Sequence, residues 1–200
     1  MITAYGDSMS GNCYKLQLVL NMLDVDHLWQ EMSITNGETQ TPEFLAKNPQ
    51  GKIPLIELDD GRVLSESNAI IGYLAEGSDL IPTATFSKAK MYQWMFFEQY
   101  SHEPYIAVAR FIQLYLGLPE DRLAEYHSLH VKGHKALAAM EAELAWQPFL
   151  CGSQFTLADI ALFAYTHVAH QGGFDLAHYP QINQWLIRIK QQAGFLPMES

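Results

Sequence analysis

Residues 54–77 read PLIELDDGRVLSESNAIIGYLAEG and contain two short apolar segments, 54–58 and 63–64. The Asp-Gly pair at 60–61 lies between them and supplies the positive backbone angles of a tight hairpin turn. Apolar residues in 67–76 then fall on one helical face, and a glycine follows where helices commonly end. The stretch therefore predicts an antiparallel strand pair followed by a helix.

The chain before this stretch alternates between strand and helix patterns. Residues 2–5 form a short strand pattern, and helical spacing over 16–23 separates it from a second strand pattern at 27–33. The Thr-Pro pair at 41–42 is typical of an N-cap followed by the first residue of a helix. The predicted order for residues 1–77 is βαβ, helix, ββα.

Strand patterns disappear after residue 77. Residues 78–86 are polar and irregular and predict a linker. Helical periodicity then covers four segments, 87–116, 119–146, 157–170 and 180–192. We predict an all-helical bundle over residues 87–200.

The third of these helices has a complete start signal. Thr156 can cap the amide of Asp159, and the Asp159 side chain can cap back. Phe155 can pack against Ile160 across the same turn. This pattern predicts a firm helix start.

The composition excludes several classes of protein. The 200 residues carry a formal charge of −10, which repels nucleic acid and anionic membrane surfaces. No stretch approaches the roughly 20 apolar residues of a membrane span, and the N-terminus lacks the features of an export signal. We expect a soluble protein with neither a nucleic-acid nor a membrane partner.

The cysteines and histidines indicate neither a disulfide framework nor a metal site. Cys13 and Cys151 are the only cysteines, a number typical of a reducing compartment, and we expect a cytoplasmic location. Among the eight histidines, His127 and His130, and likewise His130 and His134, could share a helix face, but no carboxylate or cysteine completes a ligand set with them. We predict no metal.

Three segments carry a resemblance to a known family. They are YGDSMSGNCYK at 5–15, NPQGKIP at 48–54 and LSESNAI at 64–70. Together with the order of elements, they resemble the cytosolic glutathione transferase superfamily, in particular its serine-type and bacterial nu-like members. The resemblance covers essentially the whole chain. It implies an α/β thioredoxin-like N-terminal domain that binds glutathione, followed by an all-α domain.

The first segment places Ser10 where serine-type members have the serine that activates the glutathione thiol. A free thiol has a pKa of about 8.5, and its thiolate is the nucleophile. A hydroxyl donor at a helix N-terminus can stabilise that thiolate. Tyr5 is an alternative, because other classes use a tyrosine at the end of the first strand, and Ser8 is a second alternative in the same loop.

The second segment resembles the family stretch whose Ile-Pro bond is cis. The resemblance implies that the backbone of Ile53, before Pro54, pairs with the cysteinyl backbone of glutathione. Lys52 and Gln40 are candidates for the glycine carboxylate of glutathione. For Lys52, a solvated surface position is an equal alternative.

The third segment resembles the family's Glu-Ser pair before its third helix. Glu66 can pair with the γ-glutamyl ammonium of glutathione. Ser67, at a helix N-terminus, can bind the α-carboxylate of the same group through its hydroxyl and oriented N–H groups.

Around Asn12 the chain resembles the bacterial nu-type group of the family, which has disulfide-reductase activity towards glutathione conjugates. That group has a hydroxyl residue and an asparagine before a lysine, here Ser10, Asn12 and Lys15, although it typically has threonine first and proline where this chain has Gly11. Cys13 completes a Ser-x-x-Cys pattern and is either a redox residue or a buried residue of the first helix.

The leading hypothesis is a transferase that conjugates the glutathione thiolate to a small hydrophobic electrophile, as a homodimer with no cofactor beyond glutathione. Met9 and Tyr105 are our candidates for the electrophile site, the latter in an aromatic and acidic segment that Pro104 should bend. A glutathione-dependent disulfide or peroxide reductase and a non-catalytic binding protein are the alternatives.

Overall fold

The computed structural model describes residues 1–198, which form two compact units. The first comprises Met1–Ser78 together with the C-terminal residues from Ala193, and the second comprises Asp79–Gln192. In neither unit do the described residues include a helix long and apolar enough to cross a membrane.

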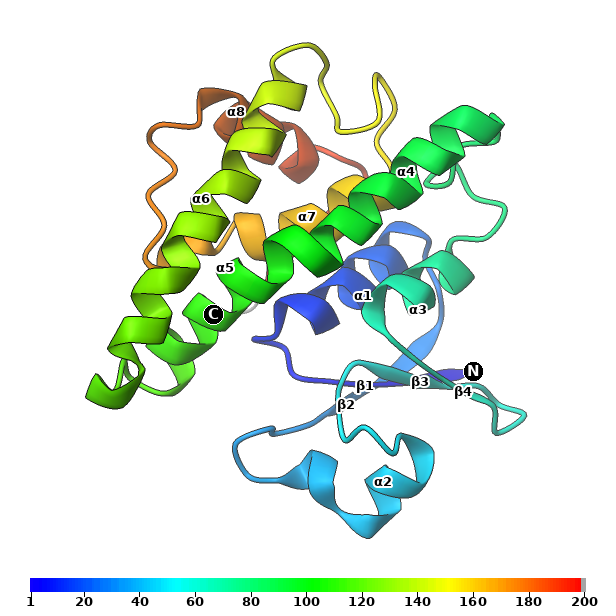
Figure 1. Cartoon of the computed structure of the whole chain (residues 1–200). Helices are drawn as coiled ribbons and strands as arrows, with labels where there is room; N and C mark the ends of the chain where they lie inside the picture. The colour runs from blue at the N-terminus through cyan, green and yellow to red at the C-terminus, as the bar shows by residue number, and fades with distance from the viewer. Residues whose placement is uncertain (199–200) are drawn as a thin grey trace. The chain divides into compact units, whose positions relative to one another are not determined.

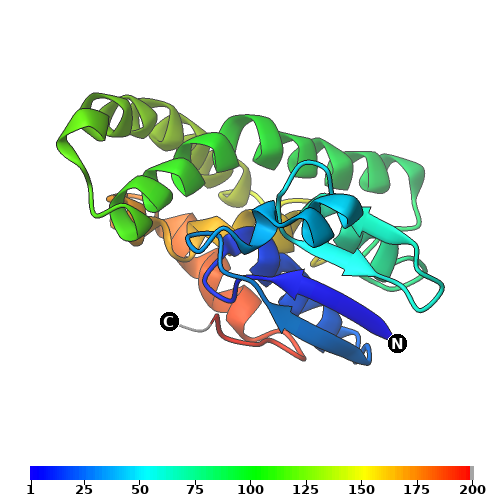
Figure 2. The same ribbon diagram turned by 90° about the horizontal axis from the view of Figure 1, so that it is seen from below.

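The first unit is built on a four-stranded sheet with the strand order β2-β1-β3-β4. The strands are β1 (Ile2–Gly6), β2 (His27–Glu31), β3 (Leu55–Glu57) and β4 (Val63–Ser65). Strand β1 pairs in parallel with β2, whereas β3 is antiparallel to both β1 and β4. Figure 2 shows β1 in dark blue between β2 and the cyan β3–β4 hairpin. The predicted order of elements along the chain, βαβ, helix, ββα, is confirmed, although β2 ends two residues before Ser33.

Helices cover both faces of this sheet (Figure 1). They are α1 (Gly11–Met22) and α3 (Ser67–Leu74) on one face and α2 (Pro42–Lys47) on the other. Because side chains alternate along a strand, Tyr5 and Leu55 lie with Phe44 and Met32 on the α2 side. Their strand neighbours Ala4 and Ile56 are fully buried as well.

The turn and cap patterns read from the sequence are present. Gly61 has a φ of 82°, and the Leu58 N–H donates to Arg62 O at 2.8 Å to close the hairpin. The Thr41 hydroxyl accepts from the Phe44 N–H at 3.2 Å, and Pro42 is the first residue of α2.

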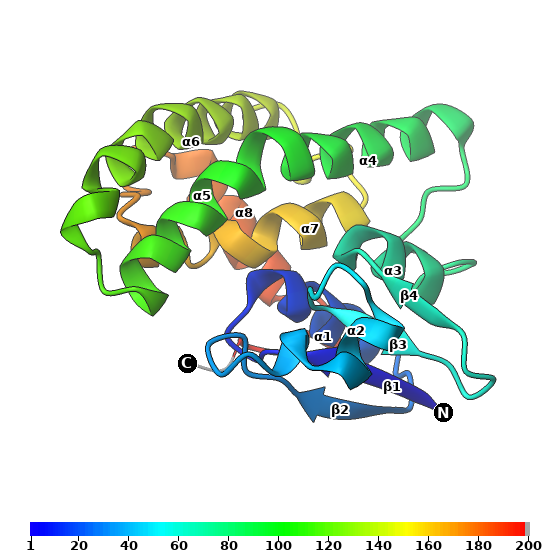
Figure 3. The ribbon, with the colours of Figure 1, turned by 60° about the horizontal axis from the view of Figure 1, so that its bottom comes forward.

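The second unit is all helical. Its helices are α4 (Thr85–Phe97), α5 (Glu103–Arg110), α6 (Leu123–Leu144), α7 (Leu157–Thr166) and α8 (Pro180–Lys190). Helix α7 contacts both α4 and α8 (Figure 3). The predicted helix 87–116 is interrupted, because π-helical turns occupy Glu98–His102 and Phe111–Tyr115. Pro104, which cannot donate a backbone hydrogen bond, follows the first of these turns.

The predicted capping box at the start of α7 is confirmed. The Asp159 carboxylate accepts from the Thr156 N–H at 3.0 Å and, through the same oxygen, from the Thr156 hydroxyl at 3.2 Å. Its second oxygen accepts from the Leu150 N–H and the Trp185 Nε1–H, both at 2.9 Å. Asp159 therefore joins α7 to the preceding loop and to α8.

The C-terminal tail packs against α1, although we expected residues 87–200 to belong to the helical domain. The Asn21 amide donates to Gly194 O at 2.8 Å, and the Tyr14 hydroxyl donates to Leu196 O at 2.6 Å. Gly194 has a φ of 70°, and a side chain there would collide with the backbone of Met22. No hydrophobic periodicity marks such a contact, so the sequence did not reveal it.

Candidate functional site

The strand register of the first unit brings three separate segments to one end of its sheet. Tyr5, near the end of β1, pairs with Leu55 at the start of β3, and Leu55 pairs with Ser65 at the end of β4. The loop after β1, the Ile53–Pro54 segment and the N-terminus of α3 are therefore neighbours. These are the three segments that carried the resemblance.

The loop after β1 holds Ser10 at the N-terminus of α1. Ser10 is the N-cap, with φ −81° and ψ 125°, and its oxygen accepts from the Cys13 N–H at 3.5 Å. Asp7, to which the sequence motif assigned no role, shapes this loop. Its carboxylate accepts from the Met9 N–H at 2.8 Å, and its carbonyl accepts from the Ser10 N–H at 2.9 Å. An aspartate at the start of a polar loop is the sequence signal for such a turn.

Cys13 lies in the first turn of α1 and is fully buried. Burial raises the pKa of its thiol to about 12, against the lowering effect of the Ser10 hydrogen bond. The thiol is therefore protonated at neutral pH, which does not favour a nucleophilic role.

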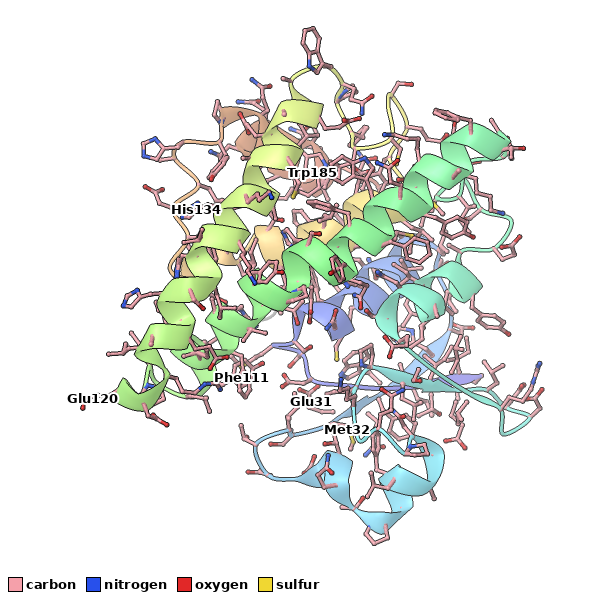
Figure 4. The ribbon with its side chains drawn as sticks, viewed as in Figure 1. Glu31, Met32, Phe111, Glu120, His134 and Trp185 are labelled. Atoms are coloured by element: carbon pink, nitrogen blue, oxygen red, sulfur yellow. The ribbon has the colours of Figure 1, made fainter. Side chains whose placement is uncertain are left out.

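The hydroxyls of the two alternatives, Tyr5 and Ser8, are bound to carboxylates. Tyr5 donates to Glu57 at 2.8 Å, and Lys47 bonds to both of these groups. The Ser8 hydroxyl and N–H both donate to Glu31, at 2.9 and 2.8 Å, and Figure 4 labels Glu31 at the end of β2.

Tyr5 also lines a cavity to which the loop that holds Ser10 contributes no residue. With Glu31, Phe44 and Lys47, among others, it lines a cavity of about 320 Å³ on the α2 side of the sheet. Its ring meets that of Phe44 edge to face, with centroids 6.2 Å apart. Ser10, and not Tyr5, therefore has its hydroxyl at the N-terminus of α1.

Glu66 and Ser67 lie at the N-terminus of α3. Glu66 is exposed, and its backbone has φ 70° and ψ 108°, values that residues other than glycine rarely adopt. Within residues 1–198 its carboxylate has no hydrogen-bond or ion-pair partner, so it is open to a cation. The N–H groups in the first turn of a helix such as α3 point toward its N-terminus and can receive an anion.

Ser67 also connects α3 to α1. Its hydroxyl donates to Asn12 Oδ1 at 3.2 Å and accepts from Lys15 Nζ at 3.3 Å. Asn12 and Lys15 lie three residues apart, on one face of α1. The sequence pattern that contains Lys15 does not reveal this contact with α3, because the two bonded residues lie 52 positions apart.

The middle segment contains the predicted cis bond between Ile53 and Pro54. Ile53 is half-buried, and Lys52 is exposed, while its carbonyl accepts from the Asn48 amide at 2.7 Å. The exposed Gln40 donates from its amide to Gly51 O at 3.1 Å and thereby supports the segment from the adjacent loop.

The two candidates for the electrophile site belong to different units. Met9 is 38% exposed in the loop after β1. Tyr105 lies on α5 and lines a cavity of about 290 Å³ with Phe97 and Ser101 and with residues of α6. Lys132 Nζ is 5.2 Å from the centroid of the Tyr105 ring.

In the part of the chain that the structure describes, no three histidine, cysteine, aspartate or glutamate residues gather as metal ligands.

Comparison with known proteins gives consistent matches along the chain. The model of the glutathione S-transferase N-terminal domain matches residues 9–76, and that of the C-terminal domain matches residues 94–193. Glutathione S-transferase 3 of Zea mays is 37% identical, over 96% of this chain and 90% of that protein. The disulfide-bond oxidoreductase YfcG of Escherichia coli (strain K12) is 28% identical, over 90% of this chain and 86% of that protein.

Solved structures match the chain as well. The crystal structure of a glutathione S-transferase from Pseudomonas fluorescens Pf-5 is 55% identical and superimposes with a TM-score of 0.98. The match covers 100% of this chain and 99% of that one.

Proposed function

The chain belongs to the glutathione S-transferase family, and on that premise we propose that it is an enzyme that conjugates the thiolate of glutathione to small hydrophobic electrophiles. One observation carries the proposal: the exposed Glu66 carboxylate, the N-terminus of α3 and the Ser10 hydroxyl lie at the same end of the sheet. Glutathione has a matching ammonium, carboxylate and thiol.

The γ-glutamyl group is proposed to bind at α3. Its ammonium pairs with Glu66, and its α-carboxylate accepts hydrogen bonds from the first N–H groups of the helix, including that of Ser67. Asn12, already hydrogen-bonded to Ser67, borders the same position. A zwitterion therefore has a partner for each of its charges.

The rest of glutathione is proposed to extend along the middle segment. The backbone of Ile53, before Pro54, pairs with the cysteinyl backbone. Lys52 and Gln40 bind the glycine carboxylate, for which their exposed positions are suited.

Ser10 is proposed as the catalytic residue. Its hydroxyl donates to the glutathione sulfur and stabilises the thiolate, with the N-terminus of α1 adding to the effect. Lowering a thiol pKa by two units requires about 2.7 kcal/mol, which these two contributions can supply. The thiolate then attacks the electrophile, a carbon–sulfur bond forms, and a leaving group such as chloride departs with its electron pair.

We propose Met9 and Tyr105 as contacts for the electrophile, and a homodimer as the functional form. Helix α4 and the turn after it carry exposed aromatic residues at successive helical turns, Tyr92, Phe96 and Tyr100, of which Phe96 is 71% and Tyr100 82% exposed. Such a contiguous apolar stripe is typical of a protein interface. A cytoplasmic role in detoxification completes the proposal.

A second candidate function is reduction of disulfides by glutathione. The similarity to a disulfide-bond oxidoreductase and the Ser10, Asn12, Lys15 pattern favour it. In that reaction the same thiolate attacks a disulfide sulfur, and a second glutathione thiolate releases oxidised glutathione and two product thiols.

Turnover with glutathione and an activated aryl chloride, and with glutathione and a small disulfide, separates the two functions. We expect conjugation to be the faster reaction. Disulfide reduction alone would support the second candidate. Bound glutathione without turnover of either substrate would contradict both and indicate a binding protein.

Removing the proposed charge partner should weaken glutathione binding. We expect Glu66→Ala to raise the dissociation constant about 10-fold, because a charge-assisted hydrogen bond contributes about 1.5–3 kcal/mol. Ser67→Ala should have a smaller effect, since the backbone N–H remains. Calorimetric titration measures both, with the exposed Glu76→Ala just beyond α3 as a control. Undiminished affinity in both site variants would remove this site.

A further inference from the structure

Lys15 is a fully buried lysine on helix α1 of the first unit. Its side chain is 0% exposed, and lysine is almost never fully buried without partners for its ammonium. Burying an ammonium has a large desolvation cost, and an apolar residue of similar volume would avoid it. A charge retained in such a place points to a role that an apolar side chain does not fill.

The hydrogen bonds around Lys15 run in one direction. An ammonium can only donate, so the Ser67 oxygen accepts from Lys15 Nζ at 3.3 Å. The proton of Ser67 then points to Asn12 Oδ1, 3.2 Å away. This chain of bonds fixes the Ser67 hydroxyl and Asn12 together. The first turn of α3 therefore has a positive charge directly behind it.

The loop after β1 and the start of α3 also carry acidic residues. Asp7, in the loop after β1, is 8% exposed, and Glu66 precedes Ser67. Both repel a carboxylate that approaches the N-terminus of α3. Lys15 is the cation that the structure places against Ser67, and its field acts through a dry, low-dielectric region.

We propose that Lys15 is a positioning residue for glutathione: acting through Ser67, its ammonium makes the N-terminus of α3 selective for the α-carboxylate of the γ-glutamyl group. This inference rests on the proposed function and adds the residue that sets recognition of that carboxylate. Lys15 itself does not touch the ligand. Its effect reaches the ligand through the Ser67 hydroxyl and through its charge.

The test compares two ligands in two proteins. The ligands are glutathione and its analogue with the γ-glutamyl α-carboxylate replaced by hydrogen. The proteins are the wild type and Lys15→Gln, which keeps an N–H donor for Ser67 and removes the charge. We expect Lys15→Gln to bind glutathione about 10-fold more weakly and the analogue equally well, as measured by calorimetry.

Each outcome has one meaning. Equal weakening for both ligands indicates a merely structural role for Lys15 and overturns the inference, as does unchanged glutathione affinity. If the wild type does not bind glutathione, the proposed function is wrong, and the inference about Lys15, which rests on it, is wrong as well. Circular dichroism and thermal unfolding check that the variant is folded. If Lys15→Gln does not fold, Lys15→Met is measured with the same ligand pair, because its apolar side chain has no desolvation cost.

Discussion

Replacing Asp159 with alanine is expected to lower the free energy of unfolding by about 3–5 kcal/mol. The carboxylate accepts hydrogen bonds from Leu150, Thr156 and Trp185, and it is 0% exposed. Alanine would leave three N–H donors buried without their acceptor, each at a cost of about 1–3 kcal/mol, and would remove the cap of α7. Urea unfolding, followed by circular dichroism, measures the change.

The matched control for this variant is Asp121→Ala, which removes an exposed aspartate and should change stability by less than about 0.5 kcal/mol. If Asp159→Ala yields no folded protein, Asp159→Asn, which keeps one acceptor oxygen, is expected to be intermediate. A midpoint for Asp159→Ala within error of the wild type would show that the network contributes nothing.

The same residue makes stability depend on pH. Burial raises the pKa of the Asp159 carboxyl to about 6, from 3.8 in the unfolded chain. The native state therefore binds this proton more tightly, and the associated stability is fully present below pH 3.8 and lost as the pH rises through 6. Relative to Asp159→Asn, the wild type should lose about 2 kcal/mol of unfolding free energy between pH 4 and pH 7.

Ser10→Ala is expected to raise the thiol pKa of bound glutathione by about two units, a change of about 2.7 kcal/mol. At neutral pH the thiolate fraction, and with it the conjugation rate, should fall roughly 10- to 100-fold. Glutathione affinity should change little, because Glu66 and the N-terminus of α3 remain. Titration of thiolate absorbance in the bound complex measures the pKa directly.

Three further variants isolate the role of Ser10. Ser10→Thr keeps a hydroxyl and should retain most of the wild-type rate. Tyr5→Phe and Ser8→Ala should leave the thiol pKa unchanged, because those hydroxyls are bound to Glu57 and Glu31. If Ser10→Ala leaves the pKa unchanged and one of the other two raises it, that residue and not Ser10 is the donor.

Local patterns predicted much of the fold because their physics is local. Gly61 at the hairpin, Thr41 before α2 and Thr156 at α7 each act within a few residues, and the structure has all three features. The π-helical turns at 98–102 and 111–115 have no periodic signature, so the sequence predicted one continuous helix. Element types were therefore more predictable than their boundaries.

In the candidate site, too, features set by a local motif were predictable, whereas features set by distant contacts were not. Motifs suggested Ser10, Glu66 and Ser67, but they left three hydroxyls as possible thiol donors. The contacts that separate them, such as Tyr5 with Glu57, span 52 residues. Such contacts depend on the assembled sheet and leave no pattern within one stretch of sequence. The bond between Lys15 and Ser67 went unassigned for the same reason.

The positive φ of Glu66 sets stability and binding against each other at one position. A backbone held in this region by a residue other than glycine costs on the order of 1–3 kcal/mol. Glycine would adopt the same angles without that cost, but it would remove the proposed partner of the glutathione ammonium. Selection for thermal stability alone would thus favour glycine at position 66, whereas selection for activity would retain glutamate.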